Sequence, residues 1–169
     1  MSVESALSYF GLLIGTITPT AIFTRFSIDA KIFQGEDLWI LGIFAIVNLI
    51  TAIVGFVSGK HIGKLVAELE KKSWSTMMLA LPLVGVFWGI LTGGAGGVIV
   101  LVVGAFLGAV IGAAVGGVVL PTFVLFHRLL KRGDLIDRKH FLPLAFGITF
   151  VISAFFSDYK FVYLILFKF

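Results

Sequence analysis

Residues 85–117 read GVFWGILTGGAGGVIVLVVGAFLGAVIGAAVGG and contain eleven of the twenty glycines in the chain. Most of these glycines fall into two series with four-residue spacing: Gly85, Gly89, Gly93 and Gly97, then Gly104, Gly108, Gly112 and Gly116. This spacing aligns the glycines on one face of an α-helix, where the missing side chains let a second helix approach closely. In a membrane, helix interfaces are built from such small residues. The stretch therefore predicts a glycine-zipper hairpin of two membrane helices.

The apolar block around this stretch, Met77–Leu130, is too long for one membrane crossing. About 20 helical residues cross a bilayer core that is about 30 Å thick. The block must fold back, and residues 93–97 are the expected turn because glycine disfavours helix. With three other apolar blocks it predicts an all-α integral membrane protein, a five-transmembrane-helix bundle in a single domain, residues 1–169. The expected spans cover about 6–23, 38–57, 74–92, 98–120 and 141–157.

The composition supports this class. The chain is 59% hydrophobic and 13% charged, whereas a soluble domain is nearer half apolar and a quarter charged. It has no cysteine, which excludes disulfides and thiolate metal sites. The net charge of +4 does not indicate a nucleic-acid partner, because the basic residues flank the apolar spans. The tail 159–169 either extends the last span or lies in the interface as an anchor, and we favour the extension.

The basic residues are unequally divided between the two sides of the expected bundle. Nine of the thirteen lie in the segments 58–75 and 127–140, which a hairpin between them places on the same side. Cytoplasmic segments next to spans carry the excess of Lys and Arg. The chain is therefore expected in the cell or inner membrane, with a cytoplasmic amino terminus and an external carboxyl terminus. Five basic residues are expected to contact anionic lipid head groups: Arg128, Lys131, Arg132, Arg138 and Lys139.

Two features at this side predict local departures from straight spans. The segment 58–75 has one apolar face and predicts a separate amphipathic helix on the inner membrane surface. Pro121 follows two glycines and predicts a kink that turns residues 122–130 toward the surface, with His127 and Arg128 at head-group depth. The three histidines, His61, His127 and His140, are expected to be exposed loop residues.

Few polar residues are expected inside the membrane. Thr16, Thr20, Asn48 and Thr51 form the best polar cluster in the predicted spans. The cluster has two interpretations: structural hydrogen bonds, with the threonines bonded to their own backbone around Pro19, or the lining of a path for a cation or polar solute. The central spans contain no Asp, Glu, Lys or Arg, which argues against a proton-coupled transporter.

The sequence contains no nucleophile motif, phosphate loop or metal-ligand spacing, so no enzyme activity, cofactor or metal is expected. The leading hypothesis is a non-enzymatic, oligomer-forming membrane protein, either a structural or accessory subunit of a membrane complex or a small channel-like assembly. The glycine stripe either joins two arms of one hairpin or faces a second copy of the chain. The alternatives are a small transporter or solute-binding component that uses the Thr/Asn cluster, and an interfacial lipid-acting enzyme.

Overall fold

The computed structural model describes residues 1–29, 39–130 and 135–157, which are almost entirely helical and contain no β-strand. The helices are α1 (Val3–Asp29), α2 (Trp39–Glu70), α3 (Trp74–Gly97), the 3-10 turn η2 (Val98–Val100), α4 (Leu101–Leu130) and α5 (Arg138–Phe156). Four helical stretches are long and apolar enough to cross a membrane, when α3 through α4 is counted as one stretch of 57 residues. The chain therefore has the composition and helix lengths of a multi-pass membrane protein.

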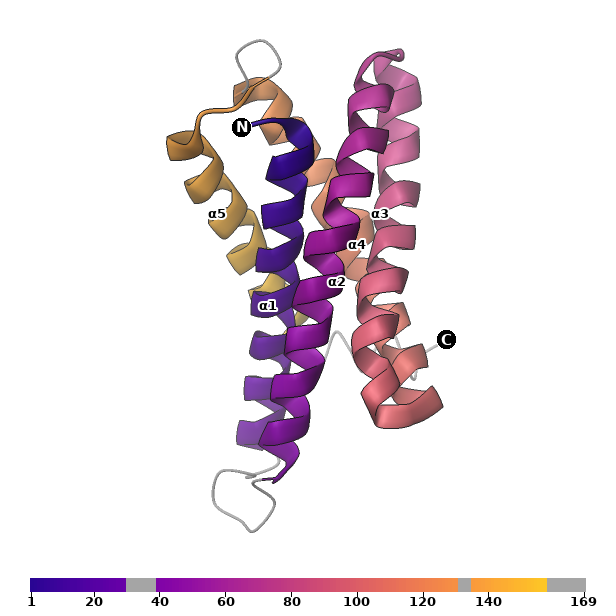
Figure 1. Ribbon diagram of the computed structural model, residues 1–169, viewed down its shortest axis with the longest axis vertical. Helices are drawn as coiled ribbons and strands as arrows, with labels where there is room; N and C mark the ends of the chain where they lie inside the picture. The colour runs from indigo at the N-terminus through magenta and orange to yellow at the C-terminus, as the bar shows by residue number, and fades with distance from the viewer. Residues whose placement is uncertain (30–38, 131–134, 158–169) are drawn as a thin grey trace.

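The helices form two antiparallel pairs and one added helix (Figure 1). The first pair is α1 with α2, the second is α3 with α4, and α5 packs against α1 and α4. The amino terminus, the α2–α3 connection and the beginning of α5 lie at the same end of the molecule (Figure 1). We call this the amino-terminal end. The arrangement brings the basic residues of α2 toward the same end as those of α4 and α5.

Glycines bring the backbones of α3 and α4 together. Gly85, Gly89, Gly93 and Gly97 face Gly116, Gly112, Gly108 and Gly104, respectively. A Cβ atom added to any of these glycines would overlap the carbonyl oxygen of the opposite glycine. Because the residue numbers rise on one helix as they fall on the other, the pair is antiparallel. The stripe is thus filled by the second arm of the same hairpin.

The expected turn at residues 93–97 is wrong, because these residues form the last turn and a half of α3. The chain reverses one step later, at η2 and at Leu101, whose positive φ of 62° is in a region that favours glycine. The physical reason is the contact with α4. Close packing of Gly93 and Gly97 against that helix stabilises helical backbone that glycine's own propensity disfavours.

The separate surface helix expected over 58–75 is also wrong. Instead, α2 continues without a break to Glu70, and Ser73 caps the beginning of α3 by accepting a hydrogen bond from the Thr76 N–H. The continuation is held by α1. Gly59 and Gly63 lie against the backbone of Leu7 and Glu4, so the close contact of α1 and α2 extends along this part of α2.

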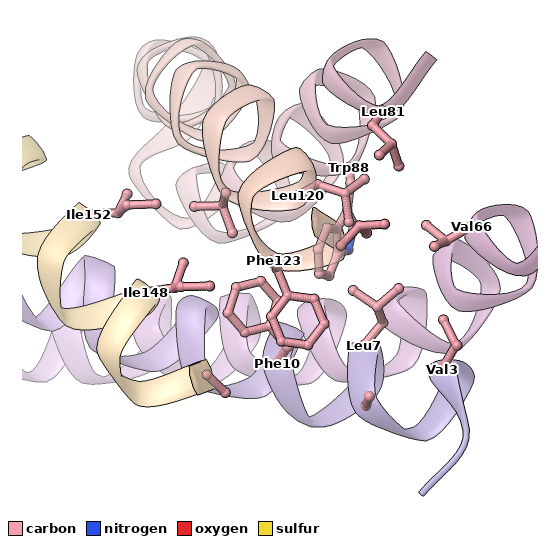
Figure 2. Close-up of a cluster of buried hydrophobic side chains, with 14 of the residues drawn as sticks. Val3, Leu7, Phe10, Val66, Leu81, Trp88, Leu120, Phe123, Ile148 and Ile152 are labelled. Carbon is pink, nitrogen blue, oxygen red and sulfur yellow. The ribbon is translucent and has the colours of Figure 1, made fainter. Parts of the chain in front are cut away.

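A cluster of buried apolar side chains joins the two pairs near the amino-terminal end (Figure 2). The rings of Phe10 in α1 and Phe123 in α4 stack with their centroids 4.1 Å apart, and Phe141 of α5 meets Phe123 edge-on. His127 lies one turn after Phe123 and is only 1% exposed. The expectation of an exposed histidine is therefore wrong for His127. The last turns of α4, after Pro121, are part of this core. Because they are buried there, they remain packed in the helix bundle.

Candidate functional site

A partly open apolar cavity of about 370 Å³ lies between the α1–α2 pair and the α3–α4 pair. It begins beyond the aromatic cluster and extends away from the amino-terminal end. Its walls include Ile14 and Phe26 of α1, Val47 of α2, Trp88 of α3 and Leu107 of α4. Several glycines of α3 and α4 also line it, which widens the space because they contribute no side chains.

The polar side-chain groups in the described cavity wall are three threonine hydroxyls and the Trp88 indole N–H, each of which already has a hydrogen-bond partner. The Thr18 hydroxyl is 2.8 Å from the Ser153 hydroxyl of α5. The Thr51 hydroxyl donates to the Val47 carbonyl oxygen at 2.8 Å, and the Thr92 hydroxyl donates to the Trp88 carbonyl oxygen at 2.9 Å. No charged side chain is in the described lining. The cavity therefore offers van der Waals contact and has neither a charge for an ion nor an ionisable group for acid–base chemistry.

The four residues of the expected polar cluster do not form one site. The Asn48 side-chain amide donates to the Thr20 hydroxyl, which joins α2 to α1. The Thr16 hydroxyl instead donates to the Leu12 carbonyl oxygen of its own helix at 2.7 Å. Thr51 faces Gly96 of α3 and lines the apolar cavity. The structure thus joins the side chains of Asn48 and Thr20, whereas the Thr16 and Thr51 hydroxyls each donate to a carbonyl oxygen of their own helix.

A smaller space of about 180 Å³ lies beside the Asn48–Thr20 pair, between α1 and α2. Its polar lining is Thr20, Thr24, Ser27 and Asn48, and its apolar lining includes Phe23 and Phe44. The two rings stack with centroids 4.2 Å apart. The Ser27 hydroxyl is buried and has no hydrogen-bond partner among the described residues. This space is small and mixed in character, so it is secondary to the apolar cavity.

Two cross-helix hydrogen bonds were missed by the sequence analysis. One is the Thr18–Ser153 bond between α1 and α5, and the other runs from the Trp88 indole N–H to the Ser58 hydroxyl at 2.8 Å. Thr18 lies on the face opposite Thr16 and Thr20, where it was overlooked. The presence of a threonine at position 18 was a signal for a bond to another helix, because an unpaired hydroxyl in hydrocarbon is costly and requires a partner.

The basic residues expected at head groups lie at the amino-terminal end where they are described. The guanidinium of Arg128 lies near the beginning of α3, and Arg138 and Lys139 are the first two residues of α5. Lys131 and Arg132 fall outside the described residues. A hydrogen bond and ion pair from Lys139, at 3.3 Å, lower the pKa of the Asp137 carboxyl, which also caps α5. In the described part of the chain, no group of three His, Cys, Asp or Glu side chains could hold a metal ion.

No protein-family model, curated protein or solved structure matches the chain. The two helix pairs and the cavity between them are the features of the described residues that bear on function. The third such feature is the group of basic residues at the amino-terminal end.

Proposed function

We propose that all five α-helices cross the membrane, that α3 and α4 form a glycine-zipper hairpin, and that the amino-terminal end faces the cytoplasm. The support is the distribution of charge. The basic residues described toward this end are Lys60, Lys64, Lys71, Lys72, Arg128, Arg138 and Lys139. Arg25, at the other end, is paired with Asp29 at 3.2 Å. Cytoplasmic segments carry the excess of Lys and Arg, which gives this orientation.

We further propose that the protein has a non-enzymatic role as a membrane component that binds an apolar ligand, the acyl chain of a lipid. The observation that carries this proposal is the apolar cavity, whose hydroxyls are already bonded and whose described walls hold no charge. Its volume of about 370 Å³ falls in the range of small-molecule pockets, about 300–1,000 Å³. In a membrane, the helices around the cavity would be surrounded by the acyl chains of the bilayer.

The dimensions favour a single acyl chain over a helix of a partner protein. The α1 lining runs from Ile14 to Phe26, a length of about 18 Å at standard helical rise. The 370 Å³ open to the centres of water molecules, spread over that length, is about 5 Å across, and adding the radius of a water molecule on each side gives a channel about 8 Å wide. Carbon atoms pack about 4 Å apart, so one alkyl chain fits. A helix with side chains is about 10–12 Å wide, so it would enter only if the two helix pairs moved apart.

Fluorescence quenching by lipids with brominated acyl chains tests this proposal. In the Trp39→Phe, Trp74→Phe double variant, Trp88 is the remaining indole, and it lines the cavity although it is only 4% exposed. We expect the brominated chains to quench Trp88. Leu107→Phe fills the cavity and should relieve the quenching, whereas Val102→Phe, on the exposed outer face of α4, should not. Equal quenching in both variants would overturn the proposal.

The accessory subunit of a membrane complex is the second candidate. Its support is the outer face of the α3–α4 hairpin, where Leu79, Phe87, Val102 and Phe106 are exposed. Both glycine series are occupied inside the hairpin, so a partner protein or second copy would have to use this apolar face. Native mass spectrometry in mild detergent separates the candidates. A defined partner or oligomer mass favours the subunit role, and a single chain with bound lipid favours the acyl-chain role.

A further inference from the structure

Arg128 is a cation whose position is set by uncharged neighbours. Its guanidinium carbon lies 5.1 Å from the centroid of the Trp74 ring, at the beginning of α3. Its Nη1 atom is 3.4 Å from the sulfur of Met77, which is fully buried. Both contacts hold the side chain against the beginning of α3. Neither contact neutralises the charge, because an aromatic face and a thioether are weak partners.

Three other basic residues differ from Arg128 because each forms an ion pair with a carboxylate. Among the described residues, Arg25 is paired with Asp29 at 3.2 Å, Lys71 with Glu68 at 2.7 Å and Lys139 with Asp137 at 3.3 Å. Arg128 has no carboxylate within ion-pair distance in the described ranges 1–29, 39–130 and 135–157. It is therefore a half-buried positive charge with hydrogen-bond donors available for an anion.

The surroundings of Arg128 correspond to the head-group layer of a membrane. Trp74 is 51% exposed, and tryptophan is enriched at the boundary between hydrocarbon and head groups. Lys72 precedes Trp74 by two residues, so a second exposed cation lies nearby. Leu129, next to Arg128, is 72% exposed and presents apolar surface beside the charge. A ligand that matches this surface has an anionic group joined to an apolar chain.

We infer that Arg128 binds the phosphate of an anionic phospholipid in the leaflet at the amino-terminal end. The planar guanidinium suits two oxygens of one phosphate, and stacking on Trp74 leaves its N–H edge available. The charge of Lys72 favours a lipid with net negative charge over a zwitterionic lipid, whose ammonium group would be repelled. The site uses none of the residues that line the apolar cavity, so it does not depend on the proposed acyl-chain role.

Native mass spectrometry of the full chain tests this inference with phosphatidylglycerol and phosphatidylcholine of identical acyl chains. We expect the protein to retain phosphatidylglycerol preferentially. Arg128→Gln should weaken that retention about ten-fold, the effect of losing one charged hydrogen-bond donor set. The matched control is Arg25→Gln, which removes an arginine already paired with Asp29 at the opposite end and should not change retention.

Two further measurements make the result decisive. Arg128→Lys keeps the charge but loses the planar stack, so partial loss of retention is expected, and it replaces Arg128→Gln if that variant does not fold. Inorganic phosphate at millimolar concentration should not displace phosphatidylglycerol, because the apolar chain contributes to binding. The inference is overturned if the two lipids are retained equally, if Arg25→Gln and Arg128→Gln have the same effect, or if inorganic phosphate alone displaces the lipid.

Discussion

The backbone of Gly112 lies so close to Gly89 that a Cβ atom added to either glycine would overlap the carbonyl oxygen of the other. Three contacts of the same kind flank it in the α3–α4 hairpin, Gly85–Gly116 on one side and Gly93–Gly108 and Gly97–Gly104 on the other. Glycine at these positions lowers helix stability, because glycine is a poor helix former and destabilises a helix by about 1 kcal/mol relative to alanine. The close approach of the two backbones offsets that cost.

Alanine substitutions at these glycines should therefore destabilise the protein. Gly89→Ala and Gly112→Ala add a methyl group against backbone, and overpacking of this kind costs about 1–3 kcal/mol. Gly147→Ala is the matched control, because nothing lies within 4 Å of a Cβ atom added there. It should be neutral or stabilising by up to about 1 kcal/mol. Unfolding monitored by circular dichroism in detergent measures all three, and a stabilised Gly89→Ala would disprove the contact.

The Thr18–Ser153 hydrogen bond should contribute to the docking of α5 on α1. Intramembrane bonds of this kind average about 0.6 kcal/mol and reach about 1.7 kcal/mol. We expect Thr18→Val and Ser153→Ala to lower stability by this amount and to be non-additive in a double-mutant cycle. Thr122→Val is the control, since the Thr122 hydroxyl donates within its own helix, to the Val118 carbonyl oxygen. Additive losses at Thr18 and Ser153 would contradict the pairing.

The Asn48–Thr20 bond should be structural and not part of a permeation path. Asn48→Leu is expected to lower stability by about 1 kcal/mol, and liposome flux of small ions and neutral solutes should be the same as with the unsubstituted chain. The physical reason is that no charged side chain is in the described lining of the adjacent space, which is small and partly apolar. A flux that disappears in a folded Asn48→Leu or Thr20→Val protein would instead support the transporter hypothesis.

The orientation can be tested with single cysteines, because the chain has none of its own. A cysteine at Ser73, between α2 and α3, should be shielded from an impermeant thiol reagent added outside intact cells. A cysteine at Ile28, near the opposite end of α1, is exposed and should react. The opposite labelling pattern would reverse the proposed topology.

The cap of α5 should depend on pH through Asp137. The hydrogen bond from Lys139 lowers the pKa of the Asp137 carboxyl in the folded protein, so the folded state favours the ionised form. The stability from this interaction is present above the pKa of an unfolded aspartate and is lost as the pH falls through the lowered value. An NMR titration should find a midpoint below that of an ordinary aspartate, and Lys139→Gln should raise it. An unchanged midpoint in Lys139→Gln would exclude this cause.

Local sequence was sufficient to predict an almost entirely helical chain with several long apolar stretches. Hydrophobicity along the chain decides whether a segment is long and apolar enough to cross a membrane, and the four such stretches agree with the expected multi-pass protein. The sequence also predicted Gly85, Gly89 and Gly112 as packing residues, since a small residue repeated every fourth position lies on one face regardless of its partner.

The tertiary structure decided which surfaces meet. The glycine stripe packs inside one hairpin, the run at 93–97 is helical, and His127 is buried, although local composition favoured a turn and an exposed histidine. The same holds for the Thr18–Ser153 bond and the apolar cavity, which join residues far apart in the sequence. Membership of a helix depends on neighbours within a few residues, whereas the partner of each face depends on how whole helices rotate and approach one another, which no local pattern specifies.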